Sequence, residues 1–298
     1  ATRQLGTLRQ ETLSRTAPGQ AADGTRAAVR DGDDWVVLDA TDVGALVADP
    51  SWRGAVEVAL ADSSATRTPV EGAILAAPIL RPAKIVCCGL NYQDHIVETG
   101  REIPQYPTLF AKFADTLTSP AADIVIEGSE KVDWEAELAV VVGAPLSKAT
   151  SAEAEAAILG YTVANDVSCR DWQSRTLQWF QGKAWDRTTP LGPVVVTADA
   201  ISPKDGLEIH AEIDGVTVQT SSTRELVFDS ADLLAYVSQF TALAPGDIVL
   251  TGTPGGVGLG MSPQRWLQDG EVLTTTIEGI GTLRNVLRIS APNDGVEE

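Results

Sequence analysis

The segment Val132–Val142 most constrains the fold, because it combines a long apolar run with two carboxylates, Glu135 and Glu137. Its apolar, β-branched residues predict a strand, in which positions i and i+2 point to the same side. Glu135 and Glu137 therefore share one face, opposite to that of Trp134 and Leu138. Two like charges this close repel each other unless a cation lies between them. A hard divalent ion, Mg²⁺ or Mn²⁺, suits such oxygen ligands.

The alternative for an isolated Glu-x-Glu pattern is a solvated acid on a half-exposed strand. A second segment favours the metal site. The apolar stretch Ile158–Ala164 also predicts a strand, and it leads into Asn165 and Asp166, with Arg170 and Gln173 following. Strand ends that pass into loops commonly display catalytic groups.

Composition excludes several classes of protein. A chain of 298 residues with 44% hydrophobic residues predicts a soluble globular protein with one large domain or two unequal ones. The formal net charge of −19 argues against nucleic acid or an anionic membrane as the main partner, because both require a basic face. No apolar run approaches the roughly 18 residues of a membrane span, and the first residues lack the apolar core of a signal peptide. We therefore expect a cytoplasmic protein.

The cysteines and histidines point the same way. The three cysteines, Cys87, Cys88 and Cys169, cannot all pair, and two of them are adjacent, so a reducing compartment is the simpler expectation. Two histidines supply too few ligands for a zinc site of the Cys/His type.

The chain divides into an N-terminal part, residues 1–80, and a larger part, residues 81–290. Short strand segments such as Thr25–Val29 and Asp34–Leu38, separated by turn residues, mark the first part as a small α+β domain. The second part has many short β segments, so we expect a mainly β fold with some α (α+β). Its predicted helices lie at residues 151–158, 171–181 and 229–240, and residues 291–298 form a frayed tail.

His95 and Glu98 lie three residues apart, which places them on the same side of one helical turn if this segment is helical. A carboxylate that binds one ring nitrogen raises the basicity of the other, and such a pair can deprotonate water. The alternative is an ordinary surface pair.

Lys183 lies in a tryptophan-rich stretch, where it can stabilise or protonate an anionic intermediate. The alternative is a surface lysine.

A strand runs into the glycine-rich loop 251–258. The loop lacks the Gly-Lys-Ser/Thr of a phosphate loop, so a nucleotide site is not predicted. Its backbone amides and the Thr253 hydroxyl can approach an anionic ligand, although a plain tight turn has the same composition.

Taken in order, six motifs resemble the fumarylacetoacetate hydrolase family, in particular its bacterial acylpyruvate hydrolase and hydroxyheptadienedioate isomerase branch. The resemblance covers roughly residues 80–290. The motifs are Gly89-Leu-Asn-Tyr-x-x-His95-x-x-Glu98, Pro107-x-Leu-Phe-x-Lys112, Glu135-x-Glu137, Asn165-Asp166-x-Ser-x-Arg170-Asp-x-Gln173, Gly182-Lys183 and Thr251-Gly-Thr-Pro-x-Gly-Val-Gly258.

The resemblance implies a mixed β-sandwich roll and a homodimer. It also implies one Mg²⁺ or Mn²⁺ per subunit, held by Glu135, Glu137 and Asp166. The implied catalytic residues are His95, Glu98 and Lys183, the first two on a lid that orders over bound substrate. The implied substrate-binding residues are Tyr92, Arg170, Gln173 and Thr253.

The leading hypothesis is hydrolysis of a carbon–carbon bond in a small 2,4-dioxo acid such as an acylpyruvate. The substrate would chelate the metal, which stabilises the enolate released on cleavage. His95, oriented by Glu98, would activate water, and Lys183 would stabilise or protonate the enolate.

Other reactions suit the same residues. Decarboxylation of an oxo acid such as oxaloacetate and keto–enol or double-bond isomerisation of a 2-hydroxydienoate also pass through an enolate, and a fold does not choose among them. A non-catalytic organic-acid binder is the alternative of another class.

Overall fold

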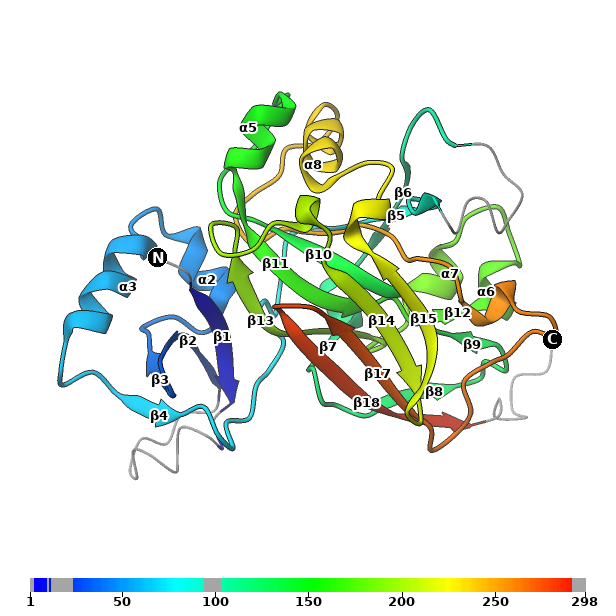
Figure 1. Ribbon diagram of the computed structural model, residues 1–298, viewed down its shortest axis with the longest axis horizontal. Helices are drawn as coiled ribbons and strands as arrows, with labels where there is room; N and C mark the ends of the chain where they lie inside the picture. The colour runs from blue at the N-terminus through cyan, green and yellow to red at the C-terminus, as the bar shows by residue number, and fades with distance from the viewer. Residues whose placement is uncertain (1–2, 10, 12–23, 94–102, 291–298) are drawn as a thin grey trace.

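The computed structural model describes residues 3–9, 11, 24–93 and 103–290. Strands dominate this part of the chain and helices are few and short, as Figure 1 shows. The mainly β, α+β fold predicted from the sequence is therefore confirmed. The frayed tail predicted at residues 291–298 lies outside the described residues.

A mixed sheet forms the body of the molecule. Within the described residues it has eleven strands, β1 (Gln4–Arg9), β2 (Thr25–Asp31), β3 (Asp34–Val37), β4 (Arg67–Pro69), β5 (Ile85–Gly89), β6 (Thr108–Lys112), β7 (Leu117–Thr118), β10 (Ala136–Val142), β11 (Ile158–Asn165), β13 (Thr189–Thr197) and β16 (Ile248–Leu250). The order is β4-β3-β2-β1-β13-β11-β10-β16-β5-β6, and β7 pairs with β13. Neighbours are antiparallel except β16 with β5 and β13 with β7.

A second sheet packs against the first. Its five strands among the described residues are β8 (Ile124–Glu127), β14 (Glu208–Ile213), β15 (Val216–Ser222), β17 (Val272–Ile277) and β18 (Gly281–Ser290), in the order β15-β14-β17-β18-β8. A short ribbon pairs β9 (Val132–Asp133) with β12 (Ser168–Cys169). Two packed mixed sheets agree with the β-sandwich roll that the resemblance implies.

Strand β10 is buried on both faces, which explains its continuous apolar sequence. Trp134, Ala136 and Leu138 pack in the cluster that fills the space between the sheets. Ala139 and Val141 pack in a second cluster on the opposite face, together with residues of the N-terminal segment. The alternation of side chains predicted for this strand is confirmed, and it directs Glu137 to the face of Ala139.

The N-terminal residues form the lobe at the left of Figure 1, where strands β1–β4 adjoin helices α2 (Val43–Ala48) and α3 (Trp52–Ala61). Strand β1 also pairs with β13, with Leu5 opposite Val195. The sheet therefore runs on across the position near residue 80 where the sequence predicts a domain boundary.

Three helical segments were predicted in the larger part. Helices α5 (Ser151–Ala156) and α8 (Ser230–Ser238) confirm two of them, and Thr150 and Glu153 form a capping box that starts α5. The third prediction, 171–181, is wrong as one helix, because the structure has two single turns, α6 (Arg170–Gln173) and α7 (Phe180–Lys183). Short 3₁₀ helices occur at Ala114–Thr116, Pro203–Asp205, Thr223–Glu225 and Gly258–Gly260. None of the described helices has the length and apolar character needed to cross a bilayer.

Candidate active site

Three carboxylates converge where β10 and β11 leave the sheet. Glu137 lies on β10 opposite Ala164 of the antiparallel neighbour β11, Glu135 precedes β10, and Asp166 follows β11. A backbone hydrogen bond from Asp166 N to Glu135 O, 2.9 Å long, ties the two strand ends together. Carboxylate oxygens of the three residues lie within 4.8 Å of one another, and all three side chains are buried.

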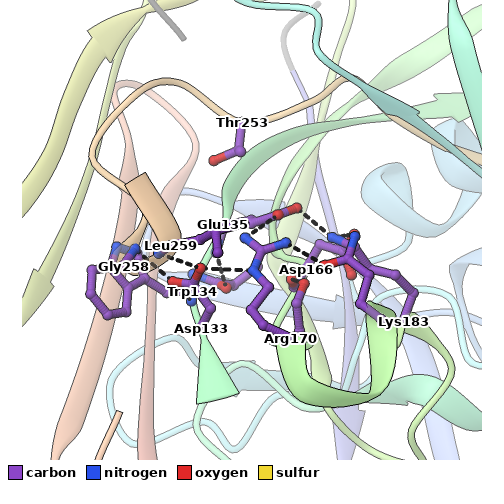
Figure 2. A network of polar contacts seen from close by, with 12 residues as sticks. Asp133, Trp134, Glu135, Asp166, Arg170, Lys183, Thr253, Gly258 and Leu259 are labelled. Carbon is purple, nitrogen blue, oxygen red and sulfur yellow. Dashed lines mark hydrogen bonds and ion pairs between the residues drawn. The ribbon is translucent and has the colours of Figure 1, made fainter. Parts of the chain in front are cut away.

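Buried cations surround two of these acids. Lys183 Nζ lies 2.6 Å from Glu135 Oε2 and 2.9 Å from Asp166 Oδ2. Lys112, at the end of β6, forms a second buried ion pair with Asp166. Arg170 Nη2 donates to Glu135 Oε1 at 2.6 Å, and Figure 2 shows this arginine between the acids. Most of the buried negative charge at Glu135 and Asp166 is thus compensated.

Glu137 differs from the other two acids. It accepts a hydrogen bond of 2.8 Å from Gly252 N, and among the described residues it forms no ion pair. Burial raises its pKa well above the usual value, and the nearby carboxylates of Asp166 and Glu135 raise it further. One carboxylate of the triad is therefore left without a cation, which is the condition under which a divalent ion stabilises such a cluster.

Glu135, Asp166 and Lys183 are held in their charged forms. Burial opposes ionisation of Glu135, but Lys183 and Arg170 outweigh it and lower the pKa of this carboxyl. Burial likewise opposes ionisation of Asp166, whose pKa is lowered by Lys112 and Lys183. Burial would lower the pKa of Lys183, yet Asp166 and Glu135 raise it, so Lys183 is an ammonium at neutral pH.

The oxygen donor set fits Mg²⁺ or Mn²⁺. Its three carboxylates are hard ligands that come from two adjacent strands. Buried ion pairs fix Glu135 and Asp166, and a backbone hydrogen bond from Gly252 fixes Glu137. Among the described residues the cluster consists of carboxylates alone.

A cleft of about 600 Å³ opens over these residues. Of the residues that the sequence places in the site, the described ones that line the cleft are Glu135, Glu137, Arg170, Gln173, Lys183 and Thr253. Asp166 is fully buried beneath them. Aromatic and aliphatic side chains form much of the remaining wall, namely Leu90, Phe110, Leu177, Trp179, Val257, Leu259 and Trp266.

Three residues predicted to bind substrate lie at the cleft and are held by one another or by neighbours. Gln173 Oε1 accepts from Arg170 Nη1 at 2.9 Å, which joins two of the three. Thr253 Oγ1 accepts from Gln219 Nε2 at 2.8 Å, which fixes the hydroxyl at the base of the glycine-rich loop. These contacts orient the three side chains at the cleft.

Tyr92 does not join them. Its side chain is fully buried in the cluster between the sheets, and it is absent from the described residues that line the cleft. Its backbone instead bridges to Leu226. His95 and Glu98 lie outside the described residues, so their predicted roles remain predictions.

Sequence reasoning missed two charged residues of this network. Lys112 appears in a motif but received no role, although the structure buries it against Asp166. Asp133 received no role either, although it shares the odd-numbered register of Glu135 and Glu137, and its fully buried carboxylate binds Arg170. That shared register was the signal available in the sequence.

Comparison with known proteins places the chain in one family. The profile of the family described as fumarylacetoacetate (FAA) hydrolase C-terminal matches residues 84–288. A rat protein named oxaloacetate tautomerase Fahd2a, mitochondrial, is 44% identical over 211 residues, which cover 70% of this chain and 67% of that protein.

Solved structures extend the likeness over nearly the whole chain. A fumarylacetoacetate hydrolase from Exiguobacterium antarcticum superposes with a TM-score of 0.79 at 29% identity, covering 97% of this chain and 100% of that one. A 5-carboxymethyl-2-hydroxymuconate delta-isomerase from Mycobacterium smegmatis gives a TM-score of 0.74 at 32% identity, covering 97% and 99%. On the family profile, the shared fold and the buried carboxylates in the cleft, the chain belongs to the fumarylacetoacetate hydrolase family and is an enzyme.

Proposed function

We propose that the chain is a divalent-metal-dependent enzyme that acts on small 2-oxo acids by stabilising their enolate forms. The observation that carries this proposal is the position of Lys183, a buried ammonium in the cleft that contacts both Glu135 and Asp166. A bound Mg²⁺ or Mn²⁺, one per subunit and held by Glu135, Glu137 and Asp166, would supply the Lewis acid that such chemistry needs.

The residues of the chain have distinct tasks. Arg170 offers guanidinium donors at the cleft, and Gln173 beside it offers an amide; both suit the carboxylate of a 2-oxo acid. Lys183, charged at neutral pH, stabilises negative charge that develops on the substrate and can return a proton to carbon.

The first reaction to test is hydrolysis of an acylpyruvate, in which water adds to the distal carbonyl and the products are pyruvate and a free carboxylic acid. His95, oriented by Glu98, is the proposed base for that water. This assignment comes from the sequence, since both residues lie outside the part that the structure describes.

The second candidate is keto–enol tautomerisation of an oxo diacid. The 44% identity to the rat oxaloacetate tautomerase favours it. The chemistry is also simpler, since tautomerisation needs only proton transfer at an enolate and no attacking water. Decarboxylation of the same kind of acid uses the same enolate, so the three reactions differ in the products that they release.

Charge in the cleft bears on the substrate. Of the cations that line it, Arg170 and Lys183 are paired with buried acids, whereas Lys131 forms no ion pair among the described residues. The Nζ of Lys131 lies 5.9 Å from the ring centroid of Trp266, at the cleft wall. We include in the proposal that Lys131 accepts a second carboxylate, which favours oxo diacids over monoacids.

One assay with two substrates tests the proposal. The purified protein with Mg²⁺ is given acetylpyruvate or oxaloacetate, while enol absorbance and pyruvate are followed with and without chelator. Enol loss with stoichiometric pyruvate from acetylpyruvate supports hydrolysis. Enol loss from oxaloacetate without pyruvate supports tautomerisation, and with pyruvate it supports decarboxylation. Chelator-insensitive rates, or none with either substrate, would contradict the proposal.

Two further parts of the proposal concern the state of the protein. We expect a homodimer. Phe113 and Phe180 support it, because they are 54% and 53% exposed and pack edge to face with ring centroids 5.7 Å apart. Light scattering tests this. We also expect a reducing compartment such as the cytoplasm, supported by three cysteines that are buried and free.

A further inference from the structure

We infer that Asp133 is a positioning residue whose buried carboxylate holds Arg170 and the glycine-rich loop together, and that it thereby sets the anion-binding wall of the cleft. This inference rests on the proposed function, because it assigns the orientation of the arginine that would bind the substrate carboxylate.

The carboxylate of Asp133 is completely buried and fully used. Oδ1 accepts from Gly258 N at 2.7 Å and from Trp134 N at 2.9 Å. Oδ2 accepts from Arg170 Nε at 2.8 Å and from Leu259 N at 3.0 Å. Figure 2 shows these contacts meeting at one side chain. Segments far apart in the sequence, around residues 133, 170 and 258, are thus joined at a single charge.

The contact to Arg170 determines which way its donors point. A guanidinium has five N–H donors in a fixed plane. Asp133 takes the Nε donor, Gln173 takes one from Nη1 and Glu135 takes one from Nη2. Two Nη donors have no partner among these contacts, and the side chain lines the cleft, so these are the donors that we assign to a ligand carboxylate. Loss of the Nε contact would leave the plane held only at its Nη atoms, by Gln173 and Glu135.

The loop side of the contact is equally specific. A Cβ atom at Gly258 would lie 1.9 Å from the Arg265 carbonyl oxygen and 2.9 Å from Asp133 Oδ1, so only glycine allows the loop to approach this closely. The next residue, Leu259, lines the cleft. Asp133 therefore holds the polar wall and part of the apolar wall in one arrangement.

The substitution Asp133→Asn tests this role, because asparagine keeps the size of the side chain and replaces one of its two acceptor oxygens with an NH₂ group. Its amide nitrogen would face donors at Arg170 Nε and Leu259 N, or at Gly258 N and Trp134 N, where no hydrogen bond can form. The expected result is a loss of about 10- to 100-fold in anion affinity, the usual effect of removing a hydrogen bond between charged groups. Binding of the metal ion itself is expected to persist, because Asp133 is not a member of the triad.

The test uses calorimetry of oxalate, a stable 2-oxo acid analogue, with the Mn²⁺-loaded protein, and it requires no turnover. The variants are Asp133→Asn, Arg170→Lys and the double variant. Arg170→Lys keeps the charge but cannot contact Asp133, Gln173 and Glu135 together, and it stands in if Asp133→Asn does not fold. We expect each single variant to bind oxalate more weakly than the wild type does. The double variant should bind oxalate no more weakly than the weaker of the two single variants.

The matched control is Asp171→Asn, on helix α6 next to Arg170. Its carboxylate binds Ser129 Oγ and Glu130 N instead of Arg170, and oxalate affinity should stay within about twofold of wild type. If the wild-type protein with Mn²⁺ does not bind oxalate, the proposed function fails. If it does, but Asp133→Asn or Arg170→Lys binds equally well, or the two losses add, the positioning role is overturned.

Discussion

Replacing Lys183 with Met should separate the structural and chemical roles of the buried ammonium. Methionine is similar in length and carries no charge, so the substitution removes the contacts of 2.6 and 2.9 Å to Glu135 and Asp166. Lys183 is 2% exposed, and breaking a buried ion pair by removing one partner costs about 3–5 kcal/mol. We expect the metal-free variant to lose about that much unfolding free energy at pH 7, measured by urea unfolding with chelator present.

The same variant should also respond to added metal and to pH in defined directions. Added Mg²⁺ or Mn²⁺ should restore part of the stability, because the ion replaces a lost positive charge beside Glu135 and Asp166. The turnover number should nevertheless fall by roughly 10²- to 10⁴-fold, the range for loss of an acid–base group. The destabilisation should shrink in acid, since both carboxyls have lowered pKa values and their ion pairs stabilise the fold less as the pH falls through them.

The matched control is Lys204→Met. Lys204 pairs with Glu155 and Asp229 at the surface and its side chain is 50% exposed, so this variant should change stability by less than about 1 kcal/mol. If Lys183→Met were no more destabilising than the control, or if it kept full activity, the reasoning about the buried ammonium would be wrong.

Four other predictions concern the metal, the base and the thiols. His95→Ala should leave metal affinity unchanged and slow hydrolysis by roughly a hundredfold or more; equal activity would remove His95 from the mechanism. Asp166→Asn should raise the Mg²⁺ concentration required for activity, and an unaltered requirement would count against it as a ligand. Because the pKa of Glu137 is raised, protons should compete with the ion, so Mn²⁺ affinity measured by calorimetry should fall as the pH is lowered; a flat profile would contradict this. Burial, with help from Glu137, raises the pKa of Cys88 to about 12, so a thiol reagent at pH 8 should modify the protein only after unfolding. Rapid modification of Cys88 in the native protein would contradict this prediction.

Local patterns in the sequence were enough to predict the strands that carry the triad. The period of two in Val132–Val142 placed Glu135 and Glu137 on one side, and the acid at the end of the next strand was Asp166. The antiparallel pairing of these strands then brings the acids together. Local pattern and tertiary structure agree here because both faces of β10 are buried.

Other features depend on contacts between distant segments, which a local pattern does not contain. One helix over 171–181 would keep its two ends apart along its axis. In the structure Gly182 of α7 instead packs directly on α6, where a Cβ would lie 2.4 Å from Gln173 Cβ and 2.6 Å from the Cys169 carbonyl oxygen. The partner of Lys112 is 54 residues away, and Asp133 contacts a loop 125 residues away. Tyr92 sits in a motif beside the cleft but turns into the core.

The most direct test of the account is a crystal structure of the protein with Mn²⁺ and oxalate, using the anomalous signal of manganese. We predict one Mn²⁺ per chain, coordinated by oxygens of Glu135, Glu137 and Asp166, with oxalate completing the coordination and Arg170 still bound to Asp133. A manganese ion at any other place, or one held without Glu137, would contradict the central claim that these three buried carboxylates form the metal site.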